Sequence, residues 1–521
     1  MLDDNNERSS TDLSIPNKVG EVEAFAKAEA AAKHGDLGLM EVYLKEAIAL
    51  GSTNVHAYLN LARYSFQQQD RKAALKYARD AYKIDSSSKE SRTFLLHALL
   101  DSGLVDEALE IIKSGLESNS TDRELELAQV ACFRHKRQWT LAKELADGLI
   151  ARYPNDPAII RLMGDVIGEQ DSHGSLPYYT RAINLSERKK KRADHTARWN
   201  LSLHLLRSRQ FKLGWKFYES GLTRDVGHMG RSVNPLLLNY KRVDLSTFKN
   251  TDKQWIFSCV EQGIGDQVLF LSVLDEALRE FEKIVLCAED RLIPIIARSF
   301  PQVKTVYPGI IEYLSSYQFP FAGFVPLGSF MGRYRTTETD FINNRKPYLK
   351  VSRSKYEKYR SMLRDEAKGL PIVGISWRGG FWESQQGNKS IQLSDWVPIL
   401  RRKAFFVSLQ YGDIAKEVSE MENTGFKIRR FANLDFKRDL DDWLALSAAC
   451  DGVVSVSTAL VHFAGAAGQK VALLMPESQG PWIHGLTDER SIVYPNVHVY
   501  RRRSHESIGD FLERGASVIQ E

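Results

Sequence analysis

The chain has 521 residues, 43% of them hydrophobic and 26% charged, and a net charge of +5. This length exceeds one ordinary core, so two or three globular domains are expected. The small positive charge gives no support to a nucleic-acid binder and only weak support to an anionic ligand.

Residues 1–21 are acidic and polar, and we expect a flexible N-terminus there. No basic segment leads into an apolar stretch, so a secretory signal is not expected. No apolar run reaches the roughly 20 residues of a membrane span. The scattered cysteines have no CxxC pair, which favours buried reduced thiols and a cytoplasmic protein. These cysteines are Cys132, Cys259, Cys287 and Cys450.

Apolar residues, most of them small, recur every 34 positions between residues 22 and 222. One series is Ala74, Ala108 and Ala142, and another is Ala47, Ala81, Gly115 and Leu149. This period is typical of a helix–turn–helix repeat, with small residues where two helices cross closely. The pattern resembles the tetratricopeptide repeat family. Residues at its consensus places are Tyr58, Leu61, Ala62, Ala74, Ala78 and Ala81.

A solenoid over residues 22–222 would offer a concave surface to a protein partner, such as an extended peptide or another domain. The alternative is that the repeats only shield the second half of the chain. Basic residues at Arg188–Arg192 are expected to form a solvated turn between helices. An anionic surface or nucleic acid is a minority alternative for that run.

After a connector at 223–252, strand-like and helix-like segments alternate, which implies parallel sheets with crossovers. We expect a first lobe at 253–350, a second at 351–505 and a C-terminal helix at 506–521. Two such lobes leave a cleft at the carboxyl ends of their strands, where ligands bind. The expected strands are Trp255–Val260, Lys283–Ala288, Val303–Tyr307, Ile372–Trp377, Phe405–Gln410, Lys427–Phe431, Gly452–Val456 and Val471–Met475. The expected helices are Val268–Phe281, Leu292–Phe300, Trp396–Arg402, Ile414–Met421, Asp442–Ala449 and Leu460–Ala467, and Pro347–Gly369 is expected to join the lobes.

Three stretches of this half together resemble one family. They are VEQGIGDQVLF at 260–270, VGISWRGG with NKSIQLSDW at 373–396, and DDWLALSAACDGVVSVSTALVHFAGAAG at 441–468. They resemble the GT-B glycosyltransferases related to the lipopolysaccharide heptosyltransferases, in the branch with N-terminal tetratricopeptide repeats. WKFYESGL at 215–222 is similar to the junction of that branch. The resemblance implies two Rossmann-like lobes, a nucleotide-sugar donor, inversion, and no metal or other cofactor.

Asp266 follows two glycines, Gly263 and Gly265, between an expected strand and its helix. Such a turn lets backbone N–H groups approach an anion or a sugar. An acidic residue in a first helical turn is also stabilised by the helix dipole, which is the plainer explanation. The resemblance implies that Asp266 is the general base that takes the proton of the acceptor hydroxyl.

Two cations lie in the loops after the strand that starts at Ile372. Arg378 follows the strand, and Lys389 with Ser390 lies in the next loop. Cations there would stabilise a leaving diphosphate without a metal. The family places a lysine at the Lys389 position on donor phosphate, and Ser390 would donate a hydrogen bond. The alternative is a pair of solvated loop cations.

Ser457 and Thr458 stand between a strand and a helix that carries His462. Either hydroxyl is a good N-cap, and the same helix start suits a diphosphate. The family usually has Asp at the Ser457 position, so this departure puts the usual donor contact in doubt. His462 is either a core histidine or, as the resemblance implies, a residue facing the donor.

Four other residues of the second lobe have plainer expected roles. Asp442 is expected as an N-cap. Gln410 lies at the cleft rim, where contact with a nucleotide base is a minor possibility. Trp377 and Trp382 are either core residues or a sugar platform.

The sequence pattern predicts an α + α/β protein, and the resemblance implies a tetratricopeptide solenoid followed by a metal-independent GT-B glycosyltransferase. The acceptor is expected to be a protein Ser or Thr, such as in flagellin, recruited by the repeats. A lipopolysaccharide or polysaccharide acceptor is the next alternative. The opposing class is an inactive GT-B scaffold that uses the repeats for protein–protein interaction, and Ser457 is its best support. Nucleic acid is not an expected partner.

Overall fold

The protein is described by a computed structural model over residues 15–34, 36–68, 70–190, 193–223, 230–231, 233, 241–245, 247–248, 255–261, 263–281, 283–306, 321–379, 389–476, 480–503 and 505–516. It forms two compact units, one ending at Leu149 and one beginning at Ile150. The predicted end of the solenoid at 222 is not the boundary between these units. Trp382 and most of the expected connector lie outside the described residues.

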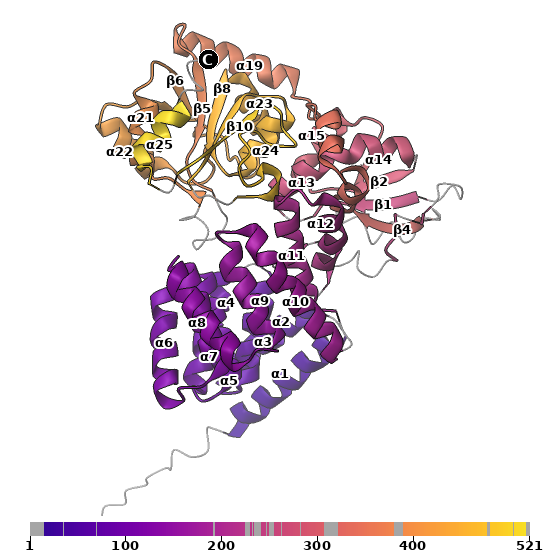
Figure 1. Ribbon diagram of the computed structural model, residues 1–521, viewed down its shortest axis with the longest axis vertical. Helices are drawn as coiled ribbons and strands as arrows, with labels where there is room; N and C mark the ends of the chain where they lie inside the picture. Colours follow the sequence, from indigo (N-terminus) through magenta and orange to yellow (C-terminus); the bar gives the residue numbers. More distant parts are fainter. Residues whose placement is uncertain are drawn as a thin grey trace, which may run out of the picture. The chain divides into compact units, whose positions relative to one another are not determined.

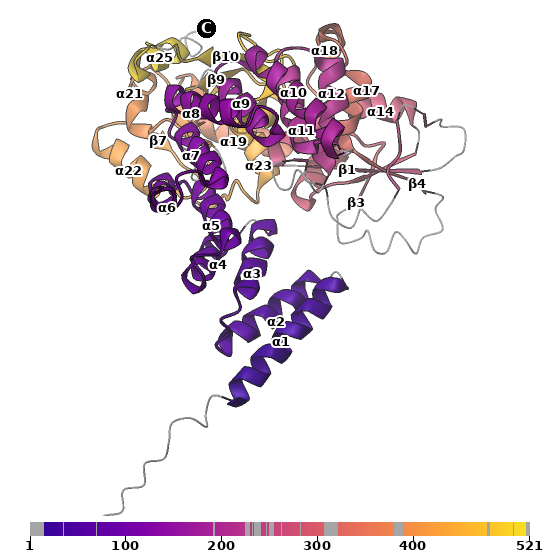
Figure 2. The same ribbon diagram turned by 60° about the horizontal axis from the view of Figure 1, so that its bottom comes forward.

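The first unit consists of successive helices that pack side by side (Figure 1; Figure 2). Capping side chains start several of them; the carboxylates of Asp70 and Asp122, for example, accept backbone N–H groups of α4 and α7. Such caps satisfy N–H groups that have no partner within the helix. The helices are α1 (Ile15–Lys33), α2 (Leu37–Ala49), α3 (Val55–Gln67), α4 (Arg71–Ile84), α5 (Lys89–Asp101), α6 (Val105–Ser118), α7 (Arg123–His135) and α8 (Trp139–Arg152), the last of which runs into the second unit.

The predicted repeat is confirmed by burial at the helix crossings. Ala74, Ala108 and Ala142 have no exposed surface. At Gly115 a β-carbon would lie only 2.4 Å from Cδ1 of Leu125, so no larger residue fits without a shift. The 34-residue spacing therefore marks the places where helices approach most closely.

The second unit begins with the last helices of the solenoid: α9 (Pro157–Gly168), α10 (Ser172–Lys190), α11 (His195–Arg207), α12 (Phe211–Tyr218) and the 3₁₀ turn η1 (Glu219–Leu222). The turn expected at Arg188–Arg192 is partly wrong, because α10 continues to Lys190 and leaves Arg188 exposed on a helix. Residues 191 and 192 lie outside the described part.

The first sheet has the strand order β3-β2-β1-β4, and every pairing is parallel. The predicted helix Val268–Phe281 begins earlier, at Ile264, and is interrupted by a 3₁₀ turn. Strand β4 was not predicted. The elements are β1 (Trp255–Cys259), α13 (Ile264–Phe270), η5 (Leu271–Val273), α14 (Leu274–Glu280), β2 (Ile284–Cys287), η6 (Asp290–Leu292), α15 (Ile293–Ser299), β3 (Lys304–Val306), β4 (Phe321–Pro326), η8 (Leu327–Phe330), α17 (Met331–Tyr334) and α18 (Glu338–Asn344).

The second sheet has the order β10-β9-β8-β5-β6-β7, again with parallel pairings. All five predicted strands are present. The expected joining segment instead contains a 15-residue helix, α19, and strand β10 was not predicted. The elements are α19 (Arg353–Ala367), β5 (Ile372–Ser376), η9 (Leu393–Trp396), α21 (Val397–Leu400), β6 (Phe405–Ser408), α22 (Ala415–Asn423), β7 (Ile428–Arg429), α23 (Leu440–Ala449), β8 (Gly452–Val456), α24 (Ala459–Ala466), β9 (Val471–Met475), η10 (Trp482–His484), β10 (Val497–Arg501) and α25 (Ile508–Gly515).

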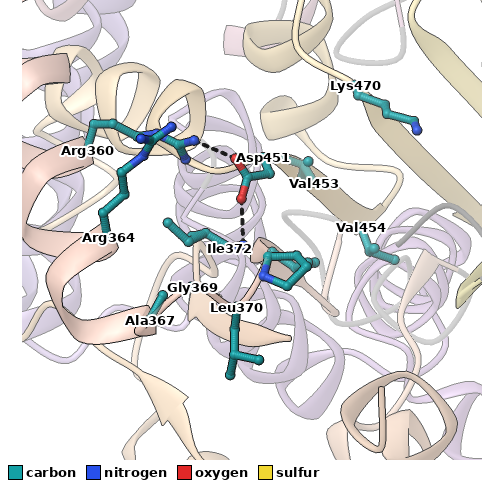
Figure 3. A pocket seen from close by; sticks show the side chains of 13 residues that line it. Arg360, Arg364, Ala367, Gly369, Leu370, Ile372, Asp451, Val453, Val454 and Lys470 are labelled. Atoms are coloured by element: carbon teal, nitrogen blue, oxygen red, sulfur yellow. Dashed lines mark hydrogen bonds and ion pairs between the residues drawn. The ribbon is translucent and has the colours of Figure 1, made fainter. Parts of the chain in front are cut away.

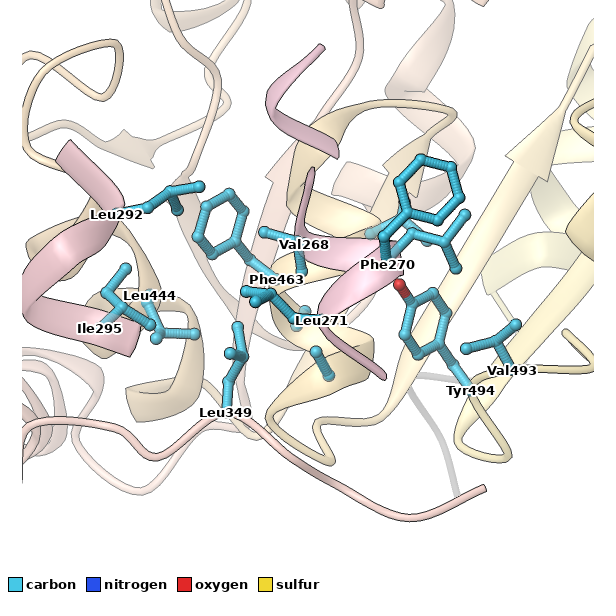
Figure 4. Close-up of a cluster of buried hydrophobic side chains, with 14 of the residues drawn as sticks. Val268, Phe270, Leu271, Leu292, Ile295, Leu349, Leu444, Phe463, Val493 and Tyr494 are labelled. Carbon is cyan, nitrogen blue, oxygen red and sulfur yellow. The ribbon is translucent and has the colours of Figure 1, made fainter. Parts of the chain in front are cut away.

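One hydrophobic core joins the two lobes. Val268 and Phe270 of α13 lie in the same buried cluster as Phe463 of α24 and Tyr494 (Figure 4). The last solenoid residues, including Trp215, also belong to this cluster. Burial of aromatic surface of this size is a main source of stability. The lobes are therefore held together through the helices that follow β1 and β8.

The four cysteines are buried and none forms a disulfide. Within the described ranges, no helix has the length and apolar character that a membrane crossing requires.

Candidate functional site

Three loops at the carboxyl ends of strands converge where the lobes meet. The loop after β1 carries Asp266 in the first turn of α13. The chain after β5 carries Gly379 and, further on, Lys389. The turn after β8 leads into α24, which bears His462. Because both sheets are parallel, these loops bring chemically active side chains from both lobes to one place.

Gly265 allows the two helices of the site to touch. A β-carbon at Gly265 would lie 3.0 Å from Cδ2 of His462 and 3.5 Å from the Cα of Ala459. Helices α13 and α24 also contact each other along their length. In this structure Gly265 therefore serves close packing of α13 against α24 at His462, one residue before Asp266. Gly263 is the exposed N-cap residue of α13, in extended backbone.

Gly379 allows a similarly close approach between chain segments of the second lobe. A β-carbon there would lie 2.6 Å from the Ser457 carbonyl oxygen and 3.3 Å from Cβ of Lys389. The Ser390 hydroxyl accepts a hydrogen bond from the Gly379 N–H over 3.2 Å and donates one to its carbonyl over 3.3 Å. Ser390 therefore braces the loop, and the chain segments of Gly379, Lys389 and Ser457 meet.

Asp266 has the electrostatics of a base that works near neutral pH. Its side chain is partly buried, and burial raises the pKa of the carboxyl to about 6. The Lys389 ammonium opposes this shift, whereas the Glu261 carboxylate adds to it. A carboxyl with this pKa is mostly ionised at pH 7 and still takes up a proton readily.

Lys389 is the cation that faces this carboxylate. Burial lowers the pKa of its ammonium, while Asp266 raises it. A partly buried ammonium has given up part of its hydration, so an anionic ligand gains more from it than from a solvated lysine. The structure thus brings Asp266 and Lys389, predicted from separate motifs, into one electrostatic unit.

His462 is held neutral. Burial, and then the Lys389 charge, lower the pKa of its imidazole to about 4. Nδ1 of His462 lies 3.0 Å from the hydroxyl of Tyr494, which in turn lies 3.3 Å from the hydroxyl of Tyr348. Tyr348 donates to the carbonyl of Val268 over 2.9 Å. The histidine is thereby tied to the backbone of α13 in the other lobe.

Arg378 does not point into this site. Nη2 of Arg378 lies 2.9 Å from the Glu417 carboxylate and donates to the Asp413 carbonyl over 2.8 Å. The expectation that Arg378 and Lys389 act together on a diphosphate is therefore not supported by its placement. The sequence does not predict this ion pair, because Glu417 lies on a separate helix, α22, far from Arg378 in the chain.

Gln410 and Trp377 are structural. Oε1 of Gln410 accepts from the hydroxyl of Ser376 and from the N–H groups of Trp377 and Arg378, at 3.0, 2.9 and 2.8 Å. Trp377 is fully buried and donates to Glu417 over 3.0 Å. Burial excludes a sugar platform at Trp377, which has no exposed surface, and a base contact at Gln410, which is 2% exposed.

Thr458 is the N-cap of α24 and accepts from the N–H of Leu460 over 3.2 Å. Ser457 precedes it, partly exposed, with its carbonyl against Gly379. The N-cap expected at Asp442 is wrong, because α23 starts earlier, at Leu440. Asp442 instead accepts from the ammonium of Lys355 over 2.7 Å, which fastens α19 to α23.

Sequence reasoning missed the polar groups behind the site. Glu261 is fully buried directly after β1, paired with Arg231 from the expected connector. Tyr348 and Tyr494 form the link from His462 to α13. A signal existed only for Glu261: a charge at the end of an apolar strand needs a buried partner.

A separate cavity of about 690 Å³ opens at the opposite edge of the second sheet, where β5 and β8 begin (Figure 3). There Asp451 accepts from Arg360 over 2.6 Å and from the Ile372 N–H over 2.8 Å. These bonds fasten α19 to the sheet. In the parts of the chain that the structure describes, no group of three or more His, Cys, Asp or Glu side chains could hold a metal ion.

No family model matches the chain. Protein FlbA of Caulobacter vibrioides (strain ATCC 19089 / CIP 103742 / CB 15) is 29% identical over 308 residues, which are 55% of this chain and 48% of that protein. The chain thus spans about half the length of the curated relative it matches.

Among solved structures, E. coli ADP-heptose lps heptosyltransferase II has 14% identity and a TM-score of 0.37, covering 51% of this chain and 99% of its own. YrrB, a TPR protein with an unusual peptide-binding site, has 14% identity and a TM-score of 0.27, covering 35% of this chain and 95% of its own. The chain is thus similar in fold to tetratricopeptide proteins and to a heptosyltransferase, each over part of its length.

Proposed function

We propose that the chain is a glycosyltransferase that moves a sugar from a nucleotide-sugar donor to a hydroxyl acceptor. The observation that carries this proposal is the meeting of Asp266, Lys389 and His462 from two lobes, with the Asp266 carboxyl at a pKa of about 6. Such a transfer is promoted by a base that takes the acceptor proton and by a cation that stabilises the leaving group.

In the proposed reaction Asp266 accepts the proton of the acceptor hydroxyl as its oxygen attacks the anomeric carbon. The bond from that carbon to the nucleoside diphosphate breaks, and the diphosphate leaves with the electron pair. Lys389 stabilises the growing negative charge, together with the backbone N–H groups at the start of α24. A single displacement inverts the anomeric carbon, and the charge on Lys389 supports a reaction without a metal.

The acceptor that we propose is a protein Ser or Thr, for example in flagellin, recruited by the helical repeats. Stacked helix pairs of this kind suit an extended polypeptide. The inactive-scaffold alternative rests on Ser457 and also on the pairing of Arg378 with Glu417, which takes that cation away from the site.

The experiment that tests this function is a thermal-shift screen of the full chain against ADP-, UDP-, GDP-, dTDP- and CMP-sugars. A ligand that binds the folded state at 100 times its Kd adds about 2.7 kcal/mol of stability. We expect one nucleotide class to raise the melting temperature, and transfer is then assayed with that donor on protein and glycan acceptors. Folded protein that responds to none of the five classes would favour the scaffold.

Replacing Lys389 by Ala should weaken donor binding roughly 10- to 100-fold, about 1.4–3 kcal/mol, because a charge-assisted contact to the diphosphate is lost. Titration of the donor by calorimetry measures this change. The matched control is Lys416→Ala, which removes an exposed lysine of α22 in the same lobe and should leave the affinity unchanged. Equal donor affinities in the two variants would show that Lys389 is a solvated loop cation that does not contact the donor.

The rate of transfer should fall as the pH drops through about 6, the pKa of Asp266, because only its ionised form accepts a proton. His462 stays neutral down to a pKa of about 4, so it does not contribute to this loss. The measurement is kcat/KM as a function of pH with the identified donor. An acid limb near the ordinary Asp value of about 4 would contradict the assignment.

A further inference from the structure

A buried ion pair lies directly behind the turn that carries Asp266. The side chains of Arg231 and Glu261 have no exposed surface. Nε of Arg231 donates to Oε2 of Glu261 over 2.5 Å, and Nη2 donates to Oε1 over 2.7 Å. Burying two charges costs free energy unless the geometry is good and the remaining polar atoms have hydrogen-bond partners.

The remaining polar atoms do find partners. Oε1 of Glu261 accepts the backbone N–H of Gly328 over 2.6 Å, and a β-carbon at Gly328 would lie 2.5 Å from that oxygen. Nη1 of Arg231 donates to Glu219 over 2.9 Å. The guanidinium lies over the ring of Tyr218, 4.8 Å from its centroid. The pair therefore ties the carboxyl end of β1 to η8 and to the end of the solenoid.

Building on the function proposed above, we propose that Arg231 and Glu261 are positioning residues for the base. Their ion pair fixes the turn that carries Asp266 and holds the Glu261 carboxylate near it. The neighbouring charge strengthens Asp266 as a base, because a nearby negative charge favours the protonated carboxyl. Arg231 holds the Glu261 carboxylate in place through two hydrogen bonds.

The charges around Asp266 determine the direction in which its pKa should change when Glu261 is replaced. Lys389 lowers the pKa of Asp266, and Glu261 raises it. Removing the charge of Glu261 must therefore lower the proton affinity of Asp266. Three further titratable groups lie around the site: Tyr218, Tyr494 and His462. Burial raises the pKa of both tyrosines and lowers the pKa of the histidine, so all three are uncharged at neutral pH.

The test measures the proton affinity of Asp266 in the full chain without donor or acceptor. The unfolding midpoint of each protein is compared with that of its Asp266→Asn counterpart from about pH 4 to about pH 7.5, and the gap between the two reports the raised pKa. In the Glu261→Gln background we expect a smaller gap, because burial still raises the pKa of Asp266 but the Glu261 charge no longer adds to it. The matched control is Glu219→Gln, which changes another carboxylate bound to Arg231 and should leave the gap as it is.

The double variant Arg231→Gln/Glu261→Gln covers the case in which Glu261→Gln does not fold, since it removes both charges and keeps hydrogen-bonding groups in place. It should show the same reduced gap. An undiminished gap in whichever variant folds would overturn the proposal. So would an unchanged kcat, where we expect a loss of about 10-fold with donor binding intact, since a weaker base transfers the proton more slowly. A wild-type chain that binds no nucleotide-sugar would refute the proposed function instead, because the gap needs no ligand.

Discussion

Asp266→Asn is expected to abolish transfer and at the same time to stabilise the folded chain. Loss of a general base costs about 10²- to 10⁴-fold in rate. Stability should rise because the native fold holds the Asp266 carboxyl at a pKa of about 6, above its ordinary 3.8. A group whose folded pKa is raised binds more protons in the folded state, so the wild-type chain loses stability as the pH increases from about 4 to about 6.

Asparagine does not ionise and avoids this loss. A difference of about two pKa units corresponds to about 3 kcal/mol, and the partial exposure of the side chain reduces this to about 1–2 kcal/mol. The variant should therefore resist urea better than the wild type at pH 7.5 and equally at pH 4. Asp365→Asn, an exposed change on α19, is the matched control and should alter neither rate nor stability.

The two measurements separate the readings of this residue. If Asp266 were only a first-turn acidic residue favoured by the helix dipole, its removal would cost stability and spare the rate. A variant that is both more stable and inactive is expected only when the carboxylate destabilises the fold and is needed for the reaction. An active Asp266→Asn enzyme would remove the assignment of the base.

The sheets were largely predictable because buried parallel strands read as short apolar runs. Gly452–Val456 and Val471–Met475 match the structure at both ends. Strand β4 was missed because FAGFVP offers too short and too irregular a pattern to separate from a loop. The sequence of helix α19 is strongly charged and therefore resembles a polar linker. Its few apolar residues face α23.

The site was predictable only in part, for a related reason. Asp266, Lys389 and His462 lie in the segments that follow strands, and the topology of parallel sheets brings such segments together. The partners of Arg378 and Asp442 come from other helices, so their ion pairs depend on tertiary packing that local sequence does not specify. The Arg231–Glu261 pair, 30 residues apart, is invisible to any local pattern for the same reason.

Trp215→Ala should destabilise the second unit by about 3–5 kcal/mol, the usual loss for a buried tryptophan. The side chain is 3% exposed and packs edge-on against Trp482 of the second lobe, with ring centroids 5.1 Å apart. Its Nε1 donates to the carbonyl of Arg335 in the first lobe over 2.7 Å. The last solenoid helix thus fills a gap that both lobes line, and its removal leaves a cavity and an unpaired carbonyl.

Urea unfolding followed by circular dichroism measures this loss, and Leu213→Ala on the same helix is the control. Leu213 is 42% exposed, so its change should stay within about 0.5 kcal/mol. Equal effects of the two variants would show that α12 is not a structural part of the lobes.

The expected result also means that cutting the chain at 222 removes core residues of the lobes, including Phe211 and Tyr218. A truncation that asks whether the solenoid selects the acceptor must therefore keep the residues from 150 onward, since a cut at 222 would abolish activity through unfolding alone.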